Sequence, residues 1–176
     1  MTSNNCLIEN IEDPLELFQK WYNEAVKNEI NDPNAMSLAT STLQGVPSVR
    51  MVLLKDYSES GFVFFTNKNS KKGREISKNK AASICFHWKS LNKQVRVDGD
   101  IVEVDSTLAD DYFLSRSKLS QVSAVASEQS SILKDRKIFL IKIDKIKKEY
   151  ENKLIPRPLH WTGFCLIPKE IEFWLD

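Results

Sequence analysis

The sequence is poor in the residues that mark several special protein classes. Only 5 glycines and 6 prolines occur in 176 residues, which excludes collagen-like and low-complexity chains. Three cysteines form no C-x-x-C pair and only two histidines accompany them, so no metal site is expected. Catalytic-triad, P-loop, G-x-G-x-x-G and H-E-x-x-H motifs are absent too. These absences leave an ordinary globular protein.

Long apolar runs and an excess of one charge are also missing. No stretch reaches the length of a membrane span, and residues 1–10 contain no apolar core of a signal peptide. The net charge is +1, so no whole-molecule field attracts nucleic acid or an anionic membrane. We therefore expect a cytoplasmic protein without nucleic-acid or membrane partners, in which any anion site is a local cluster of Lys and Arg.

The composition, 41% hydrophobic and 28% charged, is that of a folded chain long enough for one core. We expect a single domain over residues 1–176, with 1–12 flexible. Asp13-Pro14-Leu15-Glu16 combines an N-cap acid, an early proline and a glutamate, which predicts a helix start. The apolar stripe of this helix continues until residues 31–34, whose sequence Asn-Asp-Pro-Asn ends a helix.

Short apolar runs and then helical patterns fill the rest of the chain. Runs at 35–42, 49–55, 62–66 and 81–88 predict strands, the first three forming a meander. Alternation from Gln94 loses its phase at Val102 and Val104, which predicts a bulged strand. Helices are expected up to about 114, over 119–126 and over 130–148, the last packing through Ile132, Phe139, Ile143, Ile146 and Tyr150. Segments 162–167 and 171–174 predict a final hairpin, so the expected architecture is an antiparallel barrel of six or seven strands with helices outside.

Two groups of polar residues are candidates for an anion site. Arg50 and Lys55 lie at the ends of one apolar strand, on opposite faces if alternation is strict. Ser70-Lys71-Lys72 follows a strand and opens a helix, where free N–H groups and basic side chains favour a phosphate. A solvated lysine face is the alternative, and it is favoured for residues 68–80 taken alone.

Tyr112, Arg116 and Ser120 form the second group, at four-residue steps that align three donors on one helix face. An exposed helix surface explains them equally well. Ser130 and Ser131, before the long helix, are candidates for its N-cap. The histidines adjoin Trp88 and Trp161, in aromatic surroundings that do not favour a general base. Residue types and spacing alone thus indicate an anion-binding barrel.

Taken together, these segments resemble the pyridoxamine 5'-phosphate oxidase family. Their order and spacing match over nearly the whole chain, and many motifs in register make coincidence improbable. The matching stretches are Asp13-Pro14-Leu15 with Leu17-Phe18 and Trp21, Arg50-Met51-Val52-Leu53-Leu54-Lys55, Phe64-Phe65-Thr66-Asn67, Ser70-Lys71-Lys72, Gln94-Val95, Tyr112-Phe113 with Ser115-Arg116, Ser120-Gln121, Gln129-Ser130-Ser131 and Ile171-Glu172-Phe173-Trp174.

The resemblance implies a mainly β, antiparallel FMN-binding split barrel with packed helices, and a homodimer whose interface clefts hold FMN between both chains. It implies oxidation of pyridoxamine or pyridoxine 5'-phosphate to pyridoxal 5'-phosphate, with hydride transfer from C4' to flavin N5 and reoxidation by O2. By position, the implied FMN contacts are Arg50, Met51, Val52, Leu53, Leu54, Lys55, Phe65, Thr66, Lys71, Lys72, Gln94, Gln129, Ser130 and Trp174. The implied ligands of the substrate phosphate are Lys55, Tyr112, Arg116 and Ser120, and no catalytic residue is assigned.

The sequence also departs from the family pattern. Family members usually continue through an Arg-x-His-Asp-Arg motif, whereas this sequence stops at Asp176; an N-terminal segment with Arg and Tyr is missing as well. The usual Arg-Pro-x-x-Ser element is Arg116-Ser117-Lys118-Leu119-Ser120, without proline. The main hypothesis is an active or residually active oxidase. The alternatives are a non-catalytic FMN or pyridoxal-phosphate binding protein, and a barrel whose basic residues are only solvated.

Overall fold

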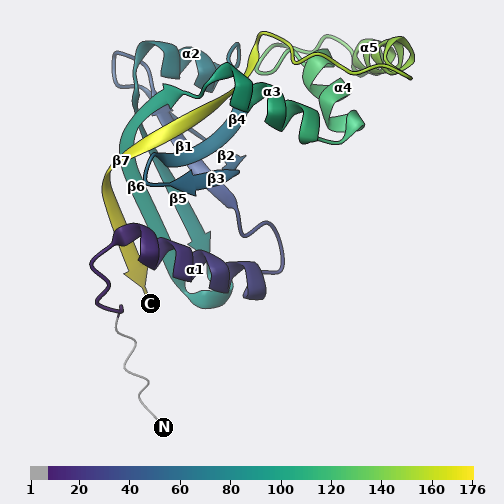
Figure 1. The fold of residues 1–176 in the computed structure, drawn as a ribbon. Coiled ribbons are helices and arrows are strands. Elements are labelled where there is room, and N and C mark those ends of the chain that lie inside the picture. Colours follow the sequence, from purple (N-terminus) through teal and green to yellow (C-terminus); the bar gives the residue numbers. More distant parts are fainter. Residues whose placement is uncertain (1–7) are drawn as a thin grey trace.

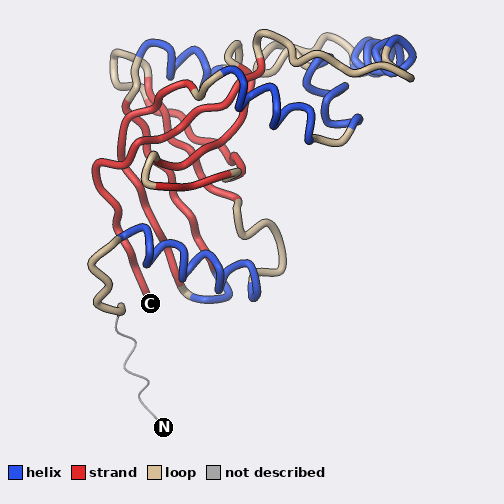
Figure 2. Tube along the Cα trace, viewed as in Figure 1, coloured by secondary structure: helices blue, strands red, loops and turns tan. Residues whose placement is uncertain are grey.

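The fold is one curved antiparallel sheet with helices at its two ends (Figures 1 and 2). The computed structural model describes residues 8–176. Its helices are α1 (Pro14–Asn28), α2 (Lys71–Lys78), α3 (Ser106–Ser115), α4 (Lys118–Ala126) and α5 (Arg136–Glu149), with a 3-10 turn at Lys89–Leu91. Its strands are β1 (Ala35–Ser41), β2 (Pro47–Leu53), β3 (Asp56–Ser58), β4 (Gly61–Asn67), β5 (Ala81–Trp88), β6 (Lys93–Glu103) and β7 (Trp161–Leu175), in the spatial order β2-β1-β5-β6-β7-β4-β3.

The main core lies inside the curve of the sheet and is closed at one end by α1 (Figure 1). The Asp13 carboxylate accepts a hydrogen bond from the Leu15 amide, as the N-cap pattern predicts. One face of the helix, including Phe18 and Trp21, is buried against strand side chains such as Phe86. The predicted first helix and barrel are therefore confirmed.

The predicted meander is wrong. Strand β2 pairs with β1, but β4 pairs with β7 and with β3, a short strand between the predicted strands 49–55 and 62–66. The reason is that β3 and β4 form their own hairpin, which turns at Gly61 with φ of +122°. Strand β2 is left at one edge of the sheet and β3 at the other.

The predicted final hairpin is also wrong, because β7 is a single strand that runs through Pro168. Opposite Asp98 and Gly99 of β6, the partners on β7 pass from Glu170 to Pro168, so Lys169 is an extra, bulged residue. Proline has no N–H to give to a ladder, and a bulge removes that demand. The bulge predicted near Val102 thus lies earlier in the ladder, on the partner strand.

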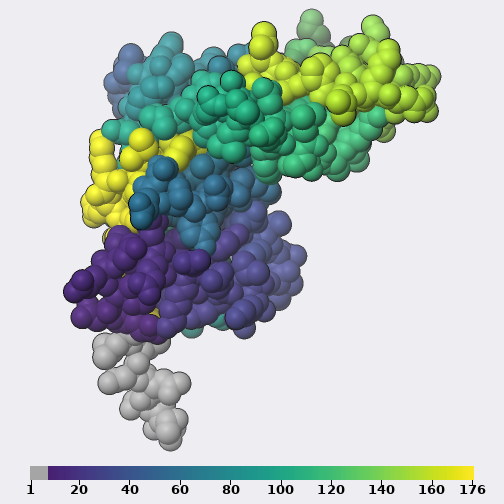
Figure 3. All heavy atoms as spheres, in the orientation of Figure 1, coloured from purple at the N-terminus to yellow at the C-terminus, as the bar shows by residue number. Residues whose placement is uncertain are grey.

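Helices α3, α4 and α5 form an arm that projects sideways from one end of the barrel (Figures 1 and 3). A small second core holds it, with buried Phe113, Val122 and Ile146 packed beside Trp161. The start of α5 was predicted too early: Asp135 caps it through the Lys137 amide, Ser130 has φ of +66° and Ile132 is 95% exposed. The capping alternative for Ser130 and Ser131 is therefore wrong. Within residues 8–176 no helix is long and apolar enough to cross a membrane.

Candidate functional site

A pocket of about 460 Å³ lies where the arm meets the barrel. Strands β2 and β4, helix α2, the arm and the first residue of β7 all contribute to its wall. The lining residues are Met51, Val52, Leu53, Lys55, Phe65, Thr66, Lys72, Tyr112, Arg116, Ser117, Ser120, Gln129 and Trp161. Three of these side chains are cationic, and no carboxylate is among them, so the pocket carries local positive charge.

Lys72 provides the first of these charges, at the start of α2. Ser70 caps this helix by accepting from the Gly73 amide, and the Lys72 ammonium lies 3.0 Å from Thr66 Oγ1 and 3.3 Å from Gln129 Oε1. Lys72 is only 6% exposed. Burial, and secondarily the positive charge of Arg50, lowers the pKa of Lys72 to about 8. An anion placed beside this ammonium would favour its charged form and offset the lowering of its pKa.

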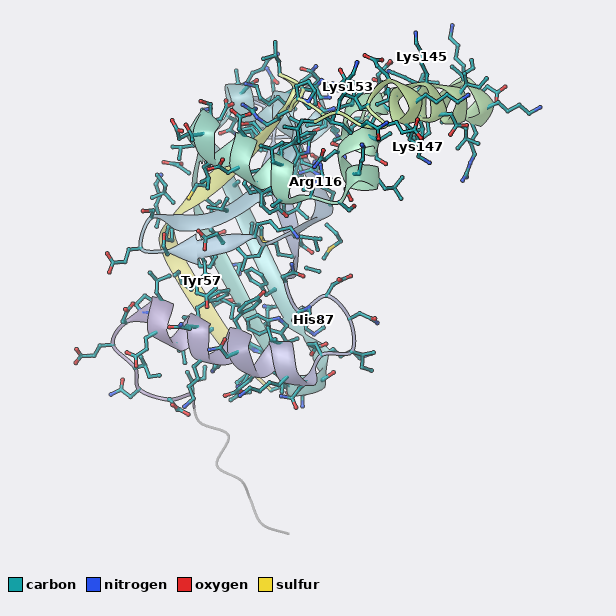
Figure 4. All side chains as sticks on the ribbon, turned by 45° about the vertical axis from the view of Figure 1, so that its right-hand side comes forward. Tyr57, His87, Arg116, Lys145, Lys147 and Lys153 are labelled. Atoms are coloured by element: carbon teal, nitrogen blue, oxygen red, sulfur yellow. The ribbon has the colours of Figure 1, made fainter. Side chains whose placement is uncertain are left out.

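Arg116, just after α3, provides the second charge (Figure 4). Its Nη1 is buried and has no hydrogen-bond partner in the described part of the chain. Burial lowers its pKa, partly offset by Tyr112. Its guanidinium carbon lies 4.8 Å from the centroid of the Trp161 ring. A buried donor without an acceptor costs free energy, so this atom fits an incoming oxygen ligand such as a phosphate.

An aromatic wall completes this side of the pocket. The rings of Phe65 and Tyr112 stack with centroids 4.0 Å apart, and Phe65 and Trp161 stack at 5.2 Å. The third cation, Lys55, has its ammonium 6.0 Å from the Tyr112 centroid. Flat apolar faces beside fixed cations can hold a planar ring that carries an anionic tail.

Arg50 lies beside the pocket rather than in its wall. Its guanidinium donates to the Leu38 carbonyl and to the hydroxyls of Thr40 and Ser48, and Nη2 lies 3.4 Å from Glu75 Oε2. Glu75 is itself buried. Burial alone would raise the pKa of this carboxyl, but hydrogen bonds from Ser48 and Thr40 and the charge of Arg50 lower it overall.

Comparison with known proteins gives matches over most of the chain. The family model described as pyridoxamine 5'-phosphate oxidase matches residues 22–150. The pyridoxine/pyridoxamine 5'-phosphate oxidase of Pelagibacter ubique is 52% identical over 98% of this chain and 83% of its own length. The same enzyme from Gluconobacter oxydans is 48% identical over 97% of this chain and 85% of its own length. The chain belongs to the pyridoxamine 5'-phosphate oxidase family.

Solved structures agree on the fold of this oxidase family. PhzG from Burkholderia lata, solved with tetrahydrophenazine-1-carboxylic acid, superposes with a TM-score of 0.90 at 28% identity, over 96% of this chain and 82% of that one. A pyridoxamine 5'-phosphate oxidase-related, FMN-binding protein from Nostoc punctiforme has a TM-score of 0.72 at 16% identity, over 92% of this chain and 84% of that one. The split-barrel prediction is therefore confirmed.

The structure brings most of the predicted site residues to the pocket. Those that line it are Met51, Val52, Leu53, Lys55, Phe65, Thr66, Lys72 and Gln129, together with the predicted phosphate ligands Tyr112, Arg116 and Ser120. Of the others, Leu54 is buried in the main core, Lys71 is exposed at the start of α2, and Ser130 is outside the lining. Arg50 lies on β2, whereas Lys55 follows the end of that strand at Leu53, so strand alternation does not decide how the two side chains are placed.

Gln94 and Trp174 are not brought to this pocket. They pair with each other across β6 and β7, at the end of the sheet that carries the C-terminus (Figure 1). Sequence reasoning missed Trp161, Ser117 and the buried Glu75. Trp161 carried one signal, its position at the start of an apolar run, three residues after Pro158.

The positions of the two histidines suggest no catalytic role for either. His87 lies near α1, at the opposite end of the molecule from Arg116 (Figure 4). His160 precedes the pocket residue Trp161, and its Nε2 lies 3.2 Å from the Ala124 carbonyl oxygen. The described residues contain no cluster of His, Cys, Asp and Glu that could hold a metal ion.

Proposed function

We propose that this chain oxidises pyridoxamine or pyridoxine 5'-phosphate to pyridoxal 5'-phosphate, with FMN as cofactor and O2 as electron acceptor. The observation that carries the proposal is the pocket itself, where Lys55, Lys72 and Arg116 converge without a carboxylate beside an aromatic wall. Relatives about half identical over nearly the whole chain support the same activity. PhzG holds a phenazine acid on a similar fold, so the fold alone does not name the substrate, and the donors placed for a phosphate are what support the proposed one.

The residues present fit FMN. We assign its phosphate to the start of α2, where the buried Lys72 ammonium has no carboxylate partner among residues 8–176 and Arg50 lies close enough to lower its pKa. Thr66 and Gln129 hold the Lys72 ammonium in place. Bound FMN would supply the redox chemistry, taking a hydride from the substrate and passing its electrons to O2.

The substrate phosphate is assigned to Lys55, Tyr112, Arg116 and Ser120. Arg116 offers a buried donor that has no partner within the described residues, and the hydroxyls of Ser120 and Ser117 lie 2.8 Å from each other at the start of α4. The role of these side chains is to bind and orient: fixed cations neutralise the phosphate, and the wall around Phe65 excludes water from the ring.

We further propose that two copies associate and that FMN lies between them. Strand β2 is a sheet edge whose outward residues Val49, Met51 and Leu53 are 68%, 61% and 39% exposed. An apolar edge of this kind favours association. Because Met51 and Leu53 also line the pocket, a second copy on β2 would close it, and that copy is the source we assign for Gln94 and Trp174.

The test of the function is reconstitution with FMN followed by assay under air. We expect quenching of FMN fluorescence on binding and formation of pyridoxal 5'-phosphate from pyridoxamine 5'-phosphate, measured by absorbance. Arg116→Met should raise KM for the substrate and leave the FMN dissociation constant within about twofold. Tight FMN binding with turnover no faster than free FMN would instead support the non-catalytic binding protein, and absence of FMN binding would refute both.

The test of association is the mass of the protein in solution by light scattering. We expect two chains for the wild type and a single chain for Val49→Glu, which places a charge in the apolar face without touching the pocket lining. The variant should lose FMN affinity together with association. A wild type that is monomeric while binding FMN tightly would contradict the shared site.

A further inference from the structure

The guanidinium of Arg116 must be held in place without using its own donors. Arg50 shows the usual solution, in which carbonyl, hydroxyl and carboxylate oxygens fix the guanidinium and consume its N–H groups. In the described part of the chain the Arg116 guanidinium has no hydrogen bond or ion pair, although it is half-buried and Nη1 is fully so. Something other than an oxygen acceptor therefore fixes it.

Trp161 offers that fixation. The guanidinium carbon of Arg116 lies 4.8 Å from the centre of its ring, and 5.9 Å from that of Phe113. A cation is attracted to the face of an aromatic ring, whereas the N–H donors of a guanidinium point outward in its own plane. Attraction to the ring face therefore holds the charge without an oxygen acceptor and leaves the N–H donors available to a ligand.

Trp161 is itself fixed from two sides. Trp161 is 6% exposed, and its ring stacks on Phe65 with an angle of 11° between the planes. Its carbonyl accepts a hydrogen bond of 2.7 Å from Arg157, and its backbone pairs with Asn67 at the start of β7. The orientation of the Trp161 ring is thus set by the sheet and by the aromatic wall, independently of Arg116.

We propose that Trp161 is a positioning residue: its ring holds the Arg116 guanidinium with its donors free, ready for the phosphate of the substrate. The identity of that phosphate rests on the proposed function. The role of Trp161 is a matter of anion binding, so it can be measured as affinity as well as turnover.

The experiment measures binding of pyridoxal 5'-phosphate to the FMN-loaded protein by calorimetry, with unphosphorylated pyridoxal as the comparison probe. Trp161→Leu keeps an apolar side chain but removes the ring, and should weaken pyridoxal 5'-phosphate binding about 5- to 30-fold, the range expected for a desolvated cation–π pair. Trp161→Phe, which keeps a smaller ring, should lose less. The ring of Trp161 also belongs to the aromatic wall, so pyridoxal affinity should fall as well, but by less than the affinity for pyridoxal 5'-phosphate.

A matched control removes the same kind of pair elsewhere. The Lys93 ammonium lies 4.7 Å from the centroid of Trp21, a buried residue of α1, so Trp21→Leu breaks a cation–π contact outside the pocket lining. This variant should leave the affinity for pyridoxal 5'-phosphate unchanged even though it lowers the melting temperature. Melting temperatures of all variants separate loss of folding from loss of binding.

A double-mutant cycle with Arg116→Met decides whether Trp161 acts through Arg116. We expect Trp161→Leu to change affinity less than twofold in the Arg116→Met background. The inference is overturned if Trp161→Leu binds like the wild type, if its full effect persists without Arg116, or if pyridoxal binding falls equally. It is also overturned if the wild type does not bind pyridoxal 5'-phosphate. Binding with the expected cycle but no turnover would refute the oxidase function and leave the role of Trp161 standing.

Discussion

Replacing Lys72 by methionine should stabilise the protein free of FMN while weakening its hold on FMN. The pKa of Lys72 falls from 10.5 to about 8, which corresponds to about 3 kcal/mol of cost for keeping the ammonium buried at neutral pH. The substitution removes this cost but loses hydrogen bonds to Thr66 and Gln129, at about 1 kcal/mol each. We expect a net gain of about 1 to 2 kcal/mol at pH 7, measured by urea unfolding of the FMN-free protein.

The pH dependence checks the cause. Because the unfolded chain keeps the Lys72 proton up to about pH 10.5 and the folded chain releases it near 8, wild-type stability should gain from this group as pH rises between these values. The raised pKa values of Cys85 and Cys165, both caused first by burial, act in the opposite direction above about pH 9. The difference between wild type and Lys72→Met cancels those contributions and isolates Lys72.

Binding should change in the opposite sense. Loss of a charge-assisted hydrogen bond to the FMN phosphate costs about 1.5 to 3 kcal/mol of binding free energy, which raises the dissociation constant roughly 10- to 150-fold. Lys78→Met, an exposed position at the far end of the same helix, is the control and should change both quantities little. A Lys72→Met protein that is less stable at pH 7, or that binds FMN as tightly as the wild type, would refute the reasoning.

Two further substitutions test the supports of the site. Glu75→Ala should lower the free energy of unfolding by about 2 to 3 kcal/mol in urea, since it strands Arg50 and two hydroxyls, whereas Glu75→Gln should lose less. The pKa of Glu75 is lowered on folding, so its contribution is present above about pH 4.5 and disappears on acidification; equal acid sensitivity of Glu75→Gln and wild type would contradict this. Gly163→Ala should cost about 1 to 3 kcal/mol, because a Cβ there would lie 2.7 Å from the Phe65 ring, and an unchanged melting temperature would show that the wall yields freely.

Local signals predicted the elements well where one chemical cue decides them. Asp13 before Pro14 fixed the start of α1, and Ser70 before two lysines fixed the start of α2. Proline at 168 misled the prediction of the last strand, because a bulge at Lys169 lets the ladder pass it. Whether a proline breaks a strand depends on the partner strand, which local sequence does not specify.

Most residues of the pocket lining were predictable from the sequence, but their geometry was not. The four-residue steps from Tyr112 to Ser120 indicated one helix face, but two helices with Arg116 between them provide those side chains. Spacing also could not show that Gln94 and Trp174 pair with each other, away from the pocket. Such long-range pairings are set by the order of strands in the sheet, which depends on the whole chain.

Met51 and Leu53 belong both to the open edge of the sheet and to the wall of the pocket. Whatever covers that strand must therefore alter how a bound molecule is retained, and a bound molecule must alter how firmly the cover is held. If a second copy covers the strand, diluting the protein would separate the two copies and thereby weaken ligand binding. Affinities measured at nanomolar and micromolar protein would differ, and saturating ligand would remove the difference.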